Sequence, residues 1–96
     1  MMRASNFKPL RKRSLRGFFD VELQSGLILR GCSLHENERG DQWVALPSRQ
    51  YTSLDGSTKF APVVEFAEGA SAARKQFQEQ ALEAVRAVVA AMVAEQ

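Results

Sequence analysis

Trp43–Arg49, with the sequence Trp-Val-Ala-Leu-Pro-Ser-Arg, decides the fold together with the Asp55–Gly56 and Phe60–Val64 segments that follow it. The residues before the proline are typical of a strand, which the proline ends or places at an edge because it has no N–H to donate to a sheet. Asp-Gly indicates a tight turn, and the next segment is again rich in β-forming residues. This order predicts a rigid β frame that displays a Ser-Arg pair, and it indicates binding rather than catalysis.

Outside this stretch, alternation of apolar and polar side chains predicts further strands. Residues 18–24 alternate clearly, and residues 27–35 form a second strand that contains Gly31, where a bulge or a close backbone approach is expected. The central stretch predicts one strand at residues 42–47, with an extension to Tyr51 as the alternative, and another strand at residues 59–66.

The last third of the chain changes to a helical period. Residues 71–95 contain no Gly or Pro after Ala72 and are rich in alanine, which favours a helix. At about 1.5 Å per residue this helix is roughly 36 Å long, whereas a globule of this size is only about 32 Å across. Because Ala87–Ala94 carries no charge, we expect a second copy to cover this end, the alternative being a frayed terminus. The expected homodimer interface comprises Val85, Val88, Val89 and Met92.

The fold class that follows is α+β, an antiparallel four- to five-stranded β-meander followed by one long C-terminal helix. Residues 1–96 are expected to form a single domain with a basic N-terminal segment (1–16), the sheet (17–67) and the helix (71–95). No apolar run is long enough to span a membrane, and the N-terminus lacks the apolar region of a signal peptide. The single cysteine fits a reducing, cytoplasmic setting.

Catalytic and metal-binding sets are not expected. Cys32 and His35 are three residues apart on a predicted strand, so their side chains point to opposite faces and cannot form a nucleophile pair. Cys32 is expected to be a small buried hydrophobe and His35 to be exposed. Asp20 and Glu22 share a strand face that is better explained as solvated than as a carboxylate dyad. The sequence therefore predicts no enzyme, no metal and no cofactor.

Charge is distributed unevenly along the chain. The first sixteen residues contain no acid, whereas the other eighty carry seven of the thirteen Lys and Arg and all eleven Asp and Glu, a balance of −4. A basic segment of this kind suits phosphates, although it is also compatible with a solubilising tail or a strand with one charged face. Pro9 leaves open whether this segment is a strand or a mobile tail. Its candidate phosphate contacts are Lys8, Arg11, Lys12, Arg13 and Arg16.

Further candidate contacts to nucleic acid lie on the predicted sheet. They are the cations Arg30, Arg49 and Lys59 and the aromatic Tyr51, because bases stack on aromatic rings flanked by cations. Arg49 alternatively pairs with a nearby carboxylate. Trp43 and Phe60 are favoured as core residues against the helix, but the sequence leaves open whether they lie at the surface.

The segments Arg16–Leu23, Leu27–Leu34 and Val44–Arg49, with Asp55–Gly56 and Phe60, resemble the stage V sporulation protein G family of bacteria over roughly residues 5–66. The Val-Ala-Leu-Pro-Ser-Arg run is the most specific element. The resemblance implies a small α+β dimer that binds nucleic acid and regulates transcription or related steps. The chain departs from the family in its alanine-rich helix and in Pro9. A weaker, purely topological likeness links the element order to positive cofactor four, a single-strand binder.

Two hypotheses of function follow. The first is a dimeric nucleic-acid-binding regulator that contacts DNA or RNA through phosphates. The second is a small protein-interaction module that uses its sheet edge or its helix.

Overall fold

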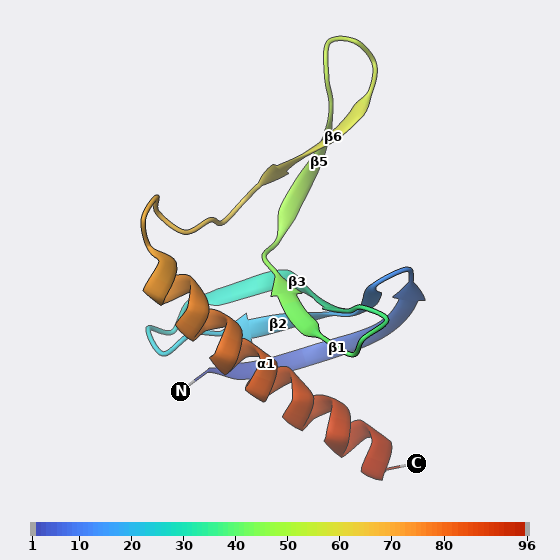
Figure 1. Cartoon of the computed structure of the whole chain (residues 1–96), viewed down its shortest axis with the longest axis vertical. Coiled ribbons are helices and arrows are strands. Elements are labelled where there is room, and N and C mark those ends of the chain that lie inside the picture. Colours follow the sequence, from blue (N-terminus) through green and yellow to red (C-terminus); the bar gives the residue numbers. More distant parts are fainter. Residues whose placement is uncertain (1, 96) are drawn as a thin grey trace.

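The computed structural model describes residues 2–95 and confirms the α+β class. Four antiparallel strands form a meander in the order β1-β2-β3-β4, two further strands form a separate hairpin, and one helix ends the chain (Figure 1). The elements are β1 (Arg3–Lys12), β2 (Leu15–Glu22), β3 (Ile28–Glu36), β4 (Gln42–Ala45), β5 (Ser48–Thr52), β6 (Thr58–Pro62) and α1 (Ser71–Ala94).

The core lies between α1 and one face of the four-stranded sheet (Figure 1). Phe77, Ala81 and Val85 are spaced four residues apart, so they form one stripe along the helix, and all three are buried. The sheet contributes the buried side chains of Phe19, Val21, Cys32, Leu34 and Val44. The predicted buried state of Cys32 is thus confirmed. α1 covers one face of the sheet, and no helix or strand among residues 2–95 covers the opposite face (Figure 1).

The basic N-terminal segment is the first strand of the sheet, which answers the question that Pro9 left open. β1 pairs with β2 from Arg3 to Lys12, with irregular register around Asn6 and Pro9. A proline is tolerated here because β1 is an edge strand. Asn6 adopts a φ of 55°, a left-handed conformation that asparagine accepts more readily than most residues. The sheet therefore begins at residue 3 and not at residue 17.

The predicted four-stranded meander is confirmed as β1–β4, but the strand predicted at residues 59–66 is not part of it and belongs instead to a hairpin of β5 and β6. They pair only with each other and form an arm, residues 48–62, that projects from the body (Figure 1). Pro47 separates β4 from β5, so the chain changes direction where the sequence allowed one strand up to Tyr51. The Asp55–Gly56 turn is confirmed at the tip of the arm, where Gly56 has a φ of 86°. The arm gives the molecule a longest dimension of 47 Å and a radius of gyration of 14.5 Å, against about 12.5 Å for a compact chain of this length.

Gly17 controls how closely β1 approaches β2. A Cβ atom at this position would lie 2.6 Å from Cζ of Phe7 and 2.8 Å from the carbonyl oxygen of Lys8. Gly17→Ala should therefore displace β1 and reduce the free energy of unfolding by about 1–3 kcal/mol, as overpacking does. A urea denaturation midpoint that does not move would show that β1 can shift without cost.

Candidate nucleic-acid interface

Most of the positive charge that the sequence singles out lies along one edge of the sheet, here called the basic edge: Arg3, Lys8, Arg11 and Lys12 of β1, and Arg13 in the turn to β2. All five side chains are exposed. The ion pairs of the described residues join Arg30 to Asp20 and Arg39 to Asp41, so none involves the basic edge. The edge is thus a row of cations with no carboxylate partner in the part of the chain that the structure describes.

Arg16 lies close in sequence but has a different role from the basic edge. Its side chain is half-buried, and Nη1 donates hydrogen bonds to the carbonyl oxygens of Arg13 (2.7 Å) and Leu15 (3.0 Å). These bonds stabilise the β1–β2 turn. Arg16 therefore helps to position the neighbouring cations and is not itself part of the basic edge.

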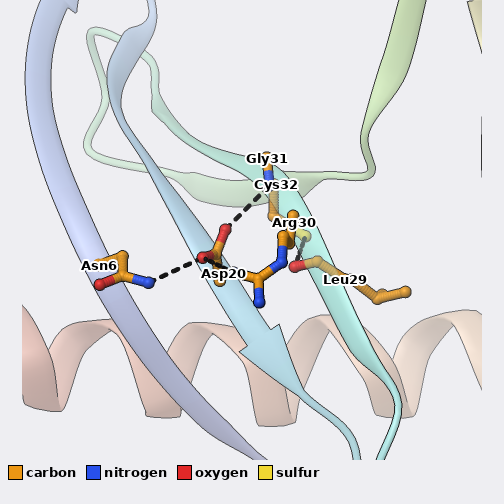
Figure 2. Close-up of polar contacts among 6 residues, drawn as sticks. All are labelled: Asn6, Asp20, Leu29, Arg30, Gly31 and Cys32. Atoms are coloured by element: carbon orange, nitrogen blue, oxygen red, sulfur yellow. Dashed lines mark hydrogen bonds and ion pairs between the residues drawn. The ribbon is translucent and has the colours of Figure 1, made fainter.

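Arg30 is an exposed cation that is already paired. Its Nη1 lies 3.1 Å from Oδ2 of Asp20. The same carboxylate accepts hydrogen bonds from Nδ2 of Asn6 (2.9 Å) and from the backbone N–H of Gly31 (3.1 Å), as Figure 2 shows. The Asn6 bond, followed by the Gly31 bond and the Arg30 charge, lowers the pKa of Asp20 despite some desolvation. Asp20 thus links β1, β2 and β3, a role that sequence reasoning missed.

Three of the predicted contact residues meet on the arm. Tyr51 pairs directly with Lys59 across the two strands, and Arg49 precedes Tyr51 by two residues, so the three share one face. Arg49 forms no ion pair within residues 2–95, although a carboxylate partner was an alternative for it. Arg49 and Arg30 line one groove of about 610 Å³ at the base of the arm.

His35 is not simply exposed, as the sequence predicted, but belongs to a polar and aromatic cluster. Nδ1 lies 3.0 Å from Oγ of Ser14 and Nε2 lies 2.9 Å from Oγ of Ser33. The imidazole stacks on Trp43 with ring centroids 5.5 Å apart and planes 7° from parallel. Desolvation, and then the positive charge of Arg16, lower the pKa of His35. Trp43 is therefore a surface residue, 38% exposed, and the preference for a core position is wrong.

The other candidates are placed as follows. Phe60, also favoured for the core, is 67% exposed on the arm. Cys32 lies in the core, where burial raises its pKa to about 11.

No group of three or more His, Cys, Asp or Glu side chains that would suit a metal ion occurs within residues 2–95. No helix in this part of the chain is long and apolar enough to cross a membrane.

The four residues expected at the dimer interface differ in how deeply they are buried. Val85 is fully buried against the sheet of its own protomer, so it belongs to the core and not to an interface. Val88, Val89 and Met92 are half-buried along the last turns of α1, and Val93 is 64% exposed beside them.

Comparison with known proteins gives no match: no protein-family model, curated protein or solved structure matches the chain. The resemblance to stage V sporulation protein G therefore stays a prediction.

The environment of His35 gives a testable pH dependence. Because its pKa is lowered on folding from the ordinary value of 6.5, the unfolded chain binds the proton more tightly than the folded one. The stabilisation is fully present above pH 6.5 and is lost as the pH falls through the lower, folded-state pKa. The melting temperature of the unmodified protein should fall on acidification from pH 7.5 to 5.5, whereas that of His35→Gln should change less. If the melting temperatures of the two proteins fall by the same amount between pH 7.5 and 5.5, His35 does not have this role.

Proposed function

We propose that the protein is a small nucleic-acid-binding regulator of the bacterial cytoplasm, which contacts DNA or RNA mainly through phosphates. The observation that supports this proposal best is the basic edge, where Lys8, Arg11, Lys12 and Arg13 are exposed and without ion-pair partners among residues 2–95. Phosphate binding releases counterions and is favoured by closely spaced cations. The regulatory role comes from the resemblance to stage V sporulation protein G.

Cations on an edge strand also have a purely structural explanation. Lys residues and prolines at a sheet edge prevent the edge from pairing with another chain, and Lys8 and Pro9 fit that use. The charges continue, however, past the end of β1 into the turn at Arg13, where there is no open strand to protect. Phosphate contact accounts for the whole row.

Charge removal at the basic edge tests the proposal. The triple variant Arg11→Ala, Lys12→Ala, Arg13→Ala should bind an oligonucleotide more weakly. Its log K against log salt slope should be smaller by about 2 units for single strands and nearly 3 for duplex, at roughly 0.7 and 0.9 per phosphate. The loss should be similar for unrelated sequences, because phosphate contacts carry no sequence information. Fluorescence anisotropy at several salt concentrations gives both quantities.

The matched control removes the same charge elsewhere. Arg39→Ala, Arg74→Ala, Lys75→Ala alters three exposed cations outside the sheet edge and should change the slope far less. Equal losses for the two triple variants would mean that net charge alone drives binding. Absence of binding by the unmodified protein at low salt would remove the nucleic-acid function.

We further propose that the protein acts as a homodimer. The uncharged end of α1 supports this, because Val93 and its half-buried neighbours Val88, Val89 and Met92 leave apolar surface exposed. A dimer would double the phosphate contacts available to one nucleic acid strand.

Val93→Glu tests the helix end as the contact between copies. A charge buried without a partner is costly, so this variant should sediment as a monomer at micromolar concentration where the unmodified protein sediments as a dimer. Val93 is exposed in the protomer, so its fold should be retained. The matched variant Leu54→Glu, at the exposed tip of the arm, should remain dimeric. Dissociation of the Leu54 variant alone would move the interface to the arm, and a monomeric unmodified protein would end the proposal.

One observation favours the second function, a protein-interaction module. The arm exposes Leu54, Phe60 and Tyr51, and an isolated two-stranded hairpin is only marginally stable in water. Such an arm gains stability when another surface covers it. The salt-series experiment separates the functions, since an interaction module without a nucleic-acid role would show no salt-dependent oligonucleotide binding.

A further inference from the structure

The face of the four-stranded sheet opposite α1 carries two rows of side chains fixed by strand register. In one row Lys8 pairs with Phe18, Phe18 with Ser33, and Ser33 with Ala45. Directly paired residues of antiparallel strands point to the same side. Each pair therefore extends the row across the sheet, starting from a cation on β1.

The second row also begins with a lysine of β1. Lys12 pairs with Leu15, Leu15 with His35, and His35 with Trp43. Both rows thus begin with a lysine of the basic edge, and each contains one exposed aromatic ring, Phe18 in the first row and Trp43 in the second. Their position opposite the helix is consistent with the core, because Phe19, Cys32, Leu34 and Val44, which alternate with the row residues, are buried against α1.

Two aromatic rings on this face are accessible and one is held rigidly. Phe18 is 41% exposed and Trp43 is 38% exposed. The indole of Trp43 stacks on His35, whose two ring nitrogens are both hydrogen-bonded to serine hydroxyls. A ring already fixed in this way loses little further freedom when a ligand stacks on it.

The charged side chains on this face indicate which kind of ligand it binds. Asp20, which lies two residues from Phe18 on β2 and therefore on the same face, already accepts hydrogen bonds from Asn6, Arg30 and the Gly31 N–H (Figure 2). Glu22 lies at the far end of β2, paired with Arg3 and away from the β1–β2 turn. Phe18 has Lys8 directly beside it across the β1–β2 pair, whereas Trp43 lies on β4 at the opposite edge of the sheet. The acids two residues away from these rings, Asp20 and Asp41, are each paired with an arginine. A second copy of the same face would bring the same cations, so the charge disfavours self-association here.

We propose that this face binds single-stranded nucleic acid, with unpaired bases stacked on Phe18 and Trp43 and the phosphates along the basic edge. The inference rests on the proposed nucleic-acid function and specifies its ligand, since bases inside a duplex have no free face for such stacking. Stacking on aromatic rings combined with a cationic track is how sheet surfaces bind single strands without sequence preference.

Trp43 is the single tryptophan of the chain, so its fluorescence reports directly on this face. Titration with a thymidine oligonucleotide should quench the emission in parallel with the anisotropy of a labelled strand, and a duplex of equal length should bind more weakly and quench little. Phe18→Ala and Trp43→Ala should each weaken single-strand binding roughly 5- to 150-fold, the range for loss of one stacked base. Trp43→Phe should recover part of the loss, and circular dichroism with thermal melting verifies the fold of each variant.

The matched control is Phe60→Ala, which removes an exposed aromatic ring from the arm and should leave single-strand affinity unchanged. If oligonucleotides bind with the salt dependence of the basic edge but without quenching, and the Phe18 and Trp43 variants bind normally, the stacking face is wrong and the proposed function stands. If folded, unmodified protein binds no oligonucleotide at low salt, both proposals fail. Equal affinity for duplex and single strand in all variants would likewise overturn the stacking face alone.

Discussion

Burial of the Phe77, Ala81 and Val85 stripe of α1 against one face of the meander is the interaction on which the rest of the structure depends. Four antiparallel strands with one helix have a single apolar interior, and among residues 2–95 it consists of eight buried apolar side chains. Gln78 strengthens the contact, because its side-chain amide exchanges two hydrogen bonds with the backbone of Val44 at 2.9 and 2.7 Å. This amide pairs with the outward backbone groups of Val44, so α1 covers part of the β4 edge of the sheet, whereas the β1 edge is open and basic.

The strand meander and the helix were predictable because each has a strong local signal. Alternation in Phe19, Val21 and their neighbours defined β2, and the long run without Gly or Pro defined α1. The position of β1 was less certain, because a proline argues against a strand unless its edge is unpaired. Whether a strand lies at the edge is a property of the whole sheet, and local sequence does not contain it.

The placement of Trp43 shows why the candidate site was harder to predict than the fold. Side chains of a strand alternate between faces, so a shift of one residue moves every side chain to the opposite side. β4 has only four residues, Gln42–Ala45, and both Trp43 and Val44 are apolar. The sequence therefore did not show which of the two side chains points into the core. Val44 points into the core at 3% exposure, and this places Trp43 outward. The contact with His35 then follows from the register of β3 with β4, which no residue pattern specified.

The arm and the open sheet face arise from the same limitation of a small chain. With one helix, only one side of one sheet can be covered, and the β5–β6 hairpin extends beyond the helix (Figure 1). The uncovered surfaces of such a chain must either be polar enough to stay in water or bind a ligand that covers them. The two surfaces differ in this respect: the sheet face combines accessible rings with the cations of β1, whereas the outermost large side chain of the arm is the fully exposed Leu54. A polyanion with planar bases complements the first surface, and an apolar protein surface complements the second. The nucleic-acid hypothesis therefore rests mainly on the sheet face and the basic edge, and the protein-interaction hypothesis rests on the arm. The arm also carries Arg49, Tyr51 and Lys59, which were predicted as nucleic-acid contacts.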